Sequence, residues 1–252
     1  MSETYSDVDG ATQPDEAVAW QERVARWRVI EAHKRRSHEL LGGAELVLDV
    51  GSGPGDDLLA LGVDRCVGVD RAAVMCARAQ ERGGIVVRAE AGALPFGDSV
   101  FDGARADRTL QHLTDPEAAL RELLRVVRPG GTLVVVDPDQ ETLSIEVPGV
   151  RRSVLDRLEA LRRDVGYRSG RWISSAPEML AGLGARAESV ESFRLVIEHP
   201  ADAFGLPTWP GFWREEGAFT DEELAEWDAA MDGIAPGFSY AVTFVLVVSR
   251  VP

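Results

Sequence analysis

The chain has 252 residues, 45% of them hydrophobic, which suits one α/β domain with a modest insertion or at most two small domains. Its formal net charge of −15 argues against a nucleic-acid partner, because a phosphate backbone requires a basic face. The longest apolar runs are too short to span a bilayer, and the acidic N-terminus does not resemble a signal peptide, so we expect a cytoplasmic protein without a membrane partner. The cysteines Cys66 and Cys76 fit reduced packing residues better than a disulfide or a metal site.

The N-terminal region is expected to be helical. Between residues 14 and 41 apolar side chains recur at helical spacing, and they form a broad face of Trp20, Val24, Trp27, Val29 and Ile30. We predict that residues 1–43 form a helical lid, although the tryptophans are more consistent with packing against a sheet than with contacting a substrate. The densest basic run, Lys34-Arg35-Arg36, predicts a solvated face of this helix.

Residues 44–138 alternate between strand-like and helical stretches. Strands are predicted at residues 46–50, 66–70, 85–88, 101–106 and 132–136, the last of which ends at Asp137. Helices are predicted between them at residues 57–61, 72–82 and 116–127. Apolar strands with few interruptions are typical of a parallel sheet that helices cover on both faces, so this region is predicted to be the core of an α/β domain.

Residues 139–252 are less regular and are predicted to complete the same domain on the substrate side. Helices are expected at residues 151–165, at 175–183 and from Thr220 onward, and strands at 187–197 and 240–249. Residues 198–219 read as a long loop that carries Phe204, Trp209, Phe212 and Trp213. These aromatic residues and the stretch Tyr167–Trp172 either wall a flat or apolar substrate or pack the helices onto the sheet.

The glycine-rich turn after the first strand predicts a ligand site. Its sequence is Asp49-Val50-Gly51-Ser52-Gly53-Pro54-Gly55, and its lack of side-chain bulk lets a ligand approach the backbone. A dinucleotide fingerprint requires a glycine at position 56, where this chain has Asp56 followed by Asp57. Two carboxylates at a helix N-terminus repel a pyrophosphate. They do not repel an adenosine ligand that has a cationic centre and no phosphate, and S-adenosylmethionine fits that description.

Acidic residues stand at four predicted strand ends, namely Asp49, Asp70, Glu90 and Asp137. In an open α/β sheet, ligands bind outside the carboxyl ends of the strands. A carboxylate at the position of Asp70 can accept both hydroxyl groups of a ribose, and Glu90 is placed to accept from the exocyclic amine of adenine. Helix capping or solvation would explain a single strand-end acid but is a poorer explanation of the set.

The chain resembles the class I S-adenosylmethionine-dependent methyltransferases between about residues 44 and 138. The resemblance is carried by the motifs Asp49-Val50-Gly51-Ser52-Gly53-Pro54-Gly55, Ala89-Glu90-Ala91-Gly92-Ala93-Leu94-Pro95-Phe96, Asp107-Arg108-Thr109-Leu110-Gln111-His112-Leu113 and Arg125-Val126-Val127-Arg128-Pro129-Gly130-Gly131. They are most similar to the small-molecule branch that includes ubiquinone and menaquinone methylation. The resemblance implies a Rossmann-like, doubly wound seven-stranded sheet, mostly parallel with an antiparallel last strand.

The resemblance also implies roles for individual residues. Residues 44–138 become the cofactor-binding core, with S-adenosyl-L-methionine as cofactor and S-adenosyl-L-homocysteine as product. Gly51 and Gly53 would meet the methionine part, Asp49 would shape the loop, and Asp70 would hold the ribose. The complete predicted cofactor set is Asp49, Gly51, Ser52, Gly53, Gly55, Asp70, Arg71, Met75, Glu90, Ala91, Asp107 and Arg108. Of these, Arg71 or Met75 would pack against adenine, Glu90 and Ala91 would meet its edge, and Asp107 and Arg108 would approach the sulfonium side.

Methyl transfer needs little chemistry from the protein, because the sulfonium is already an activated donor. The chain must align the acceptor with the methyl group and exclude water, and it needs a base only if the acceptor loses a proton. Some O-methyltransferases of this branch have two histidines after the fourth strand, whereas this chain has Gln111-His112. The candidate bases are therefore Asp137 and His112, with Asp139 as a weaker one. Asp137 is preferred because its strand end aims it at the crevice.

The leading hypothesis is a methyltransferase that acts on a small molecule, such as an intermediate of secondary metabolism. A second hypothesis is methylation of a peptide or protein N-terminus, since an acidic surface suits a basic acceptor. A third is a protein that keeps the cofactor fold without methyl transfer, either a cyclase or a binding subunit. The sequence predicts no metal, and it leaves open whether the chain forms a homodimer.

Overall fold

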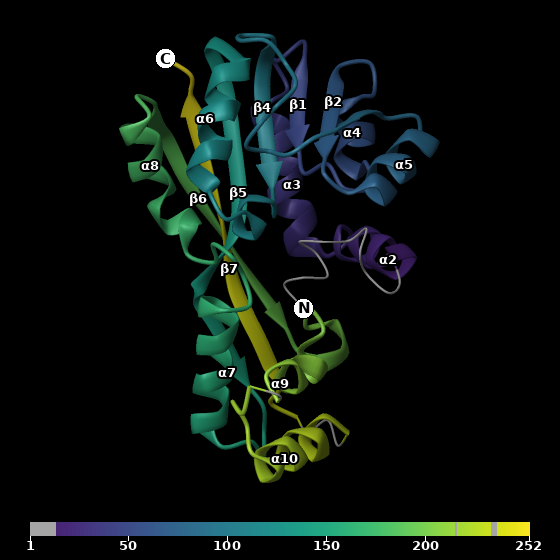
Figure 1. Ribbon diagram of the computed structural model, residues 1–252, viewed down its shortest axis with the longest axis vertical. Helices are drawn as coiled ribbons and strands as arrows, with labels where there is room; N and C mark the ends of the chain where they lie inside the picture. Colours follow the sequence, from purple (N-terminus) through teal and green to yellow (C-terminus); the bar gives the residue numbers. More distant parts are fainter. Residues whose placement is uncertain (1–13, 215, 233–235) are drawn as a thin grey trace.

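The computed structural model describes residues 14–214, 216–232 and 236–252. Its centre is a seven-stranded sheet in the order β3-β2-β1-β4-β5-β7-β6 (Figure 1). The strands are β1 (Val47–Val50), β2 (Cys66–Asp70), β3 (Ile85–Arg88), β4 (Phe101–Asp107), β5 (Val127–Glu146), β6 (Arg186–Ile197) and β7 (Ser239–Arg250). Strands β3, β2, β1, β4 and β5 are parallel, and β7 runs antiparallel to both of its neighbours. The predicted fold class is therefore confirmed.

Helices cover both faces of the sheet because buried side chains alternate along each strand. On β5, Val134 and Val136 face one hydrophobic cluster, which contains side chains of α3 (Arg28–Leu40), α4 (Asp56–Leu61) and α5 (Ala73–Glu81). Leu133 and Val135 face the other cluster, which is formed with α6 (Pro116–Val126) and α8 (Ala176–Gly182). Both cysteines are free and buried in the first cluster.

The predicted N-terminal helix is in fact two helices, so the single helix over residues 14–41 was wrong. Helix α2 (Pro14–Val24) ends before a turn, and α3 begins after Trp27, whose backbone is extended (φ −71°, ψ 136°). The break brings the ring of Trp27 within 5.0 Å of Phe204 and 6.0 Å of Trp20, measured between ring centroids. These aromatic contacts explain why one continuous helix is not favoured. Helix α2 lies beside α5, where Val18 packs with Ala72 and Met75.

Strand β5 is much longer than the predicted strand at residues 132–136. Its neighbour β4 ends opposite Val136. Pro138 has no amide hydrogen to donate, but beyond Val136 there is no β4 strand to receive one, so the proline does not interrupt the sheet. Strand β5 then continues along β7 as far as Glu146, across an irregularity between Asp139 and Ser144.

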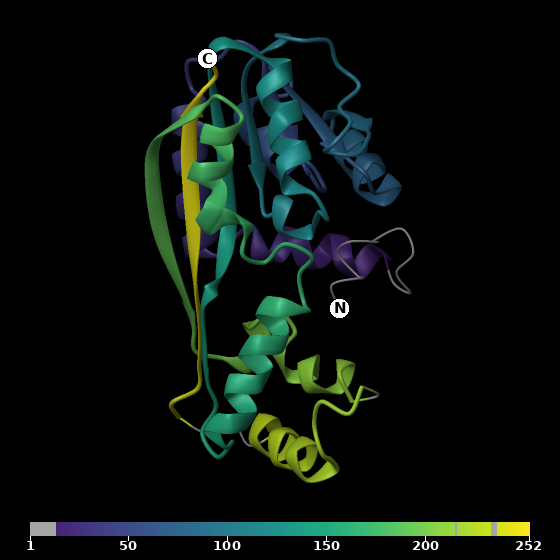
Figure 2. The same cartoon turned by 60° about the vertical axis from the view of Figure 1, so that its left-hand side comes forward.

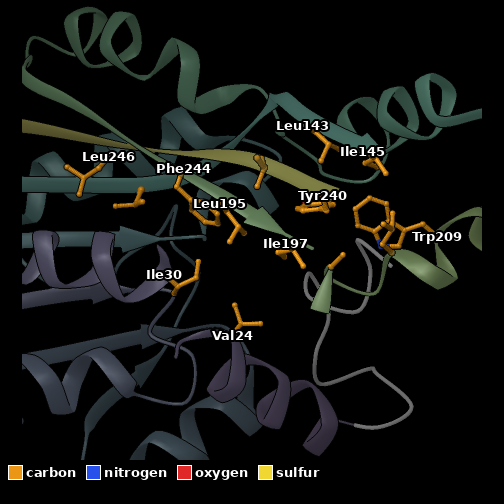
Figure 3. Packing of buried hydrophobic residues seen from close by; sticks show 14 of the residues in the cluster. Val24, Ile30, Leu143, Ile145, Leu195, Ile197, Trp209, Tyr240, Phe244 and Leu246 are labelled. Carbon is orange, nitrogen blue, oxygen red and sulfur yellow. The ribbon is translucent and has the colours of Figure 1, made fainter. Parts of the chain in front are cut away.

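The distal halves of β5, β6 and β7 carry a lobe below the core (Figures 1 and 2). Its helices are α7 (Arg152–Asp164), α9 (Trp209–Phe212) and α10 (Asp221–Asp232), with short 3-10 turns η3 (Pro200–Asp202) and η4 (Leu206–Thr208). The loop predicted at residues 198–219 thus contains two 3-10 turns and one short helix. Figure 3 shows the buried side chains running from Leu246 and Phe244 in the core to Tyr240 and Trp209 in the lobe. One hydrophobic cluster therefore joins the two parts. None of the helices in the described ranges has the length and apolar character needed to cross a bilayer.

Candidate active site

A first cavity of about 1090 Å³, its open mouth included, lies at the carboxyl ends of β1, β2 and β4. This is the edge at which an open α/β sheet binds ligands. Most of the predicted cofactor residues line it, namely Gly51, Ser52, Gly53, Asp70, Arg71, Met75, Glu90, Ala91, Asp107 and Arg108. Gly55 does not, because it lies against α5, where an added Cβ would be 2.9 Å from the Cβ of Ala79. Asp49, which is 1% exposed, does not line the cavity either.

The glycine turn is shaped to keep side chains out of the first cavity. Gly51 has a φ of 73°, and a Cβ there would lie 2.0 Å from Thr109 Oγ1. Gly53 has a φ of 53°, and a Cβ there would meet nothing within 4 Å. Gly53 therefore borders open space that a ligand can fill. Ser52 Oγ is buried beside it and has no hydrogen-bond partner among the described residues.

Asp70 links the glycine turn to the end of β2. Its Oδ2 accepts a hydrogen bond from the Gly53 amide and its Oδ1 accepts one from the Ala72 amide, each at 2.9 Å. Burial raises the pKa of Asp70 above its ordinary value, and these two donors oppose the shift. Because each carboxylate oxygen accepts more than one hydrogen bond, Asp70 keeps acceptor capacity for a ligand in the cavity.

A buried ionic network around Arg105 of β4 forms part of the cavity floor, because Arg105, Asp57 and Asp107 all line the first cavity. This arginine is 1% exposed, and its Nη1 lies 3.1 Å from Asp49 Oδ1 and 2.8 Å from Asp57 Oδ2. Its Nη2 lies 2.8 Å from Asp107 Oδ2. Burial raises the pKa of Asp49 to about 7 although Arg105 opposes the shift. Burial also tends to raise the pKa of Asp107, but His33 and Arg105 lower it by more, so the pKa of Asp107 lies well below its usual range.

Helix α3 ties the N-terminal region to this network. His33 Nε2 lies 3.2 Å from both carboxylate oxygens of Asp107, His38 Nε2 lies 2.8 Å from Asp57 Oδ1, and the Lys34 ammonium pairs with Asp57. Lys34 also lines the first cavity. The predicted solvated basic face is therefore wrong for Lys34, whose side chain is only 12% exposed, although Arg35 remains largely exposed.

The sequence interpretation missed His33, Lys34 and Arg105. Arg105 did leave a signal, since it is a lone basic residue inside an otherwise mostly apolar strand. Nothing in the spacing of His33 and Lys34 indicated which face of their helix would be buried.

A second cavity of about 550 Å³, open solvent at its mouth included, adjoins the first. Its lining residues are Trp20, Gln21, Arg108, Gln111, His112, Pro138, Gln140, Arg162, Tyr167, Phe204, Tyr240, Val242 and Phe244. Three of them, Gln21, Arg108 and His112, line both cavities. Of the predicted aromatic wall, Tyr167 and Phe204 are present, whereas Trp209 and Trp213 are buried in the hydrophobic core.

His112 stands where the two cavities meet. It belongs to the 3-10 turn η1 (Leu110–His112), and its Nδ1 is buried with no hydrogen-bond partner among the described residues. Burial lowers the pKa of His112 to about 3, and the positive charges of Arg162, Arg108 and Arg168 contribute to the shift. The imidazole is therefore neutral at physiological pH and has a nitrogen lone pair available.

Asp137, the preferred base, lines neither cavity. It is 0% exposed, and its Oδ2 accepts hydrogen bonds from the Trp172 indole at 2.7 Å and the Gln111 amide at 3.1 Å. Burial raises the pKa of Asp137 well above its ordinary value. Its carboxyl group thereby fastens η1 and the turn η2 (Trp172–Ser175) to the middle of β5. This geometry favours positioning over proton transfer.

The fold and the first cavity define a Rossmann-like domain with a ligand site at the carboxyl ends of its parallel strands. Residues 48–135 match a family model described as a methyltransferase domain. A 37.1 kDa protein of a Streptomyces fradiae transposon is 38% identical over 165 residues, which cover 61% of this chain and 48% of that protein. The chain thus spans about half the length of that relative.

Two further matches extend over a larger share of both this chain and the protein that it matches. Demethylmenaquinone methyltransferase of Mycobacterium tuberculosis is 31% identical over 184 residues, which cover 71% of this chain and 73% of that enzyme. The crystal structure of an S-adenosylmethionine-dependent methyltransferase from Thermotoga maritima has a TM-score of 0.60 and 18% identity, and the match covers 100% of both chains. The latter shows a shared fold. The chain belongs to the class I S-adenosylmethionine-dependent methyltransferases.

Proposed function

We propose that the chain transfers a methyl group from S-adenosylmethionine in the first cavity to a small-molecule acceptor in the second. The observation that carries this proposal is the shared lining, since Gln21, Arg108 and His112 border both cavities. A donor and an acceptor bound on either side of these residues would meet there. The aromatic wall of the second cavity suits a flat acceptor such as an intermediate of secondary metabolism in the cytoplasm.

The residues of the first cavity fit the cofactor. Asp70 offers carboxylate oxygens where a ribose would lie, with Met75 and Arg71 beside the adenine position and Glu90 and Ala91 at its edge. Gly51, Ser52 and Gly53 border the methionine position, and the unpartnered Ser52 hydroxyl can donate there. Asp107 and Arg108 lie toward the second cavity, and Asp49 supports the turn from below through Arg105.

When bound, the cofactor supplies a methyl group activated by a sulfonium. This methyl group would be transferred to a lone pair of the acceptor by in-line displacement, with the electron pair of the carbon–sulfur bond left on sulfur. The chain orients the acceptor for this in-line displacement and keeps water out. His112 contacts the acceptor and can take its proton only transiently, because its low pKa makes the imidazolium unstable. Asp137 acts as a positioning residue that holds Gln111 and Trp172.

The test begins with calorimetric titration of the purified chain with S-adenosylhomocysteine. A panel of small aromatic acceptors is then incubated with S-adenosylmethionine, and products that gain one CH₂ in mass are sought together with S-adenosylhomocysteine. We expect binding and at least one methylated product. The absence of any binding heat would refute the cofactor assignment. Binding with no product from any acceptor class, peptides included, would favour a non-transferase role.

A further inference from the structure

The second cavity contains a buried positive charge without a counter-ion. Arg162 of α7 is 5% exposed, and it forms no ion pair with a carboxylate in the described ranges. Its guanidinium lies between the rings of Tyr167 and Trp209, with the central carbon 4.3 and 4.1 Å from their centroids. Nη2 donates to the Tyr167 hydroxyl at 2.6 Å, whereas Nε has no hydrogen-bond partner among the described residues.

Other arginines of the same helix behave differently. Arg152 pairs with Glu159 at 2.9 Å, and Arg163 pairs with Asp164 at 3.1 Å. Both are considerably more exposed than Arg162. An ion that is buried without a partner costs free energy, and such groups concentrate where a ligand completes them. The aromatic rings offset only part of this cost.

The residues around Arg162 reinforce its charge. The lining of the second cavity contains Arg108 and Arg162 but no aspartate or glutamate, in a chain whose formal net charge is −15. Arg108 has Asp107 Oδ1 at 3.9 Å from its Nε and no hydrogen bond at that nitrogen within the described part of the chain. The depressed pKa of His112, caused by burial and then by Arg162 and Arg108, reports the same positive field.

We infer that the second cavity binds acceptors that carry a carboxylate on a flat apolar body, with Arg162 as the anchor of the carboxylate. This inference rests on the proposed function, which makes the second cavity the acceptor site. A planar guanidinium matches a carboxylate, and one unpaired cation calls for one negative charge. The apolar body would lie among the rings of Tyr167, Phe204 and Phe244.

The position of Arg162 also separates the anchor from the reacting atom. Arg162 lines only the second cavity, whereas His112 and Arg108 line both. A carboxylate bound at Arg162 therefore lies in the second cavity and outside the first, where the methyl donor would bind. The atom that receives the methyl group is accordingly a different atom of the acceptor, one that points toward His112.

The experiment measures binding of naphthoate, naphthamide and naphthyl phosphate to the full chain saturated with S-adenosylhomocysteine, with benzoate and benzamide as one-ring probes. We expect at least one carboxylate to bind about tenfold or more tightly than its neutral amide, because the amide has no negative charge that could pair with Arg162. The Arg162→Gln variant should lose this preference. The matched control Arg163→Gln removes one positive charge from the same helix and should keep it.

Affinity for S-adenosylhomocysteine serves as the check of folding, since Arg162 does not line the first cavity. We expect it to be unchanged in Arg162→Gln. Equal binding of acid and amide, no carboxylate binding at all, or tighter binding of naphthyl phosphate than of naphthoate would each overturn the carboxylate assignment. A chain that binds naphthoate through Arg162 but not S-adenosylhomocysteine would instead refute the proposed function and leave the anion site standing.

Discussion

The two cavities that meet at His112 are built from very different parts of the chain. Most of the first cavity comes from residues 50–113, whose lining members lie mainly at or near the carboxyl ends of parallel strands and at the starts of the helices that follow. The second cavity is assembled from segments as far apart as Trp20 and Phe244. The first is thus a property of one supersecondary motif, and the second depends on the extended strands, the lobe and the N-terminal helices.

The cavities also differ in how their charges are balanced. At the floor of the first cavity, Arg105 is in contact with three carboxylates, and Lys34 and His38 also contact Asp57. In the second cavity Arg162 has no counter-ion in the described ranges. A paired network fixes the shape of a site before the ligand arrives, whereas an unpaired charge gives a site its preference for a charged ligand.

The largest effect is expected for Arg105→Met, which leaves Asp49, Asp57 and Asp107 without their shared cation. We expect the free energy of unfolding at neutral pH to fall by about 3–5 kcal/mol, as when one partner of a buried pair is removed. Urea unfolding measures it. The control Arg121→Met breaks an exposed pair with Glu117 and should cost less than about 1 kcal/mol. Equal losses in the two variants would contradict the network's structural role.

Asp70→Ala should affect the first cavity alone. We expect the dissociation constant of S-adenosylhomocysteine to rise roughly 10- to 150-fold, because a ribose would lose a charged acceptor. Calorimetry measures this, with Asp64→Ala as an exposed control and naphthoate binding as a readout of the second cavity. If the affinity for S-adenosylhomocysteine does not change, Asp70 has no such role; if naphthoate binding falls equally, the cavities are not separable.

The same contrast explains what the sequence could predict. The core strands and the lining at Gly51, Gly53 and Asp70 follow from a continuous pattern of apolar strands, glycines and strand-end acids. The break before Trp27 and the length of β5 depend on long-range contacts, namely the ring of Phe204 and the absence of β4 beyond Val136. Arg162 was missed because a basic residue on an amphipathic helix gives no sign of which neighbours will enclose it.

The pH dependence of stability tests the burial of His112 and the positive charges around it. The folded pKa of His112, about 3, lies below the ordinary value of 6.5, so the unfolded chain binds more protons between these values. Its contribution to stability is therefore present above pH 6.5 and is lost as the pH falls toward 3. The difference in unfolding free energy between His112→Asn and the parent chain should therefore shift by about 2 kcal/mol in favour of the variant when the pH is lowered from 8 to 5. Urea unfolding at both pH values measures this, and the exposed His199→Asn is the control. An equal effect at both pH values would show that His112 titrates normally.

The smallest effect on stability is expected for Asp137→Asn, and its kinetics separate a base from a positioning residue. Burial raises the folded pKa of Asp137, so the native state binds the extra proton, and stability falls as the pH rises from the unfolded value near 3.8 toward the folded one. Asparagine does not titrate and can still accept from Trp172 and Gln111 through its carbonyl oxygen. The variant should therefore match or exceed the parent in unfolding free energy at pH 8.

Loss of a general base would lower turnover by roughly 10²–10⁴-fold, whereas loss of a positioning group should lower it less and leave the shape of the pH–rate profile unchanged. We expect the second result for Asp137→Asn, with the affinity for S-adenosylhomocysteine preserved because Asp137 does not line the first cavity. A larger loss that removes one limb of the pH–rate profile would restore Asp137 as the base. That outcome would also require a route for the proton from the second cavity past Gln111, whose backbone amide donates to Oδ2 of Asp137.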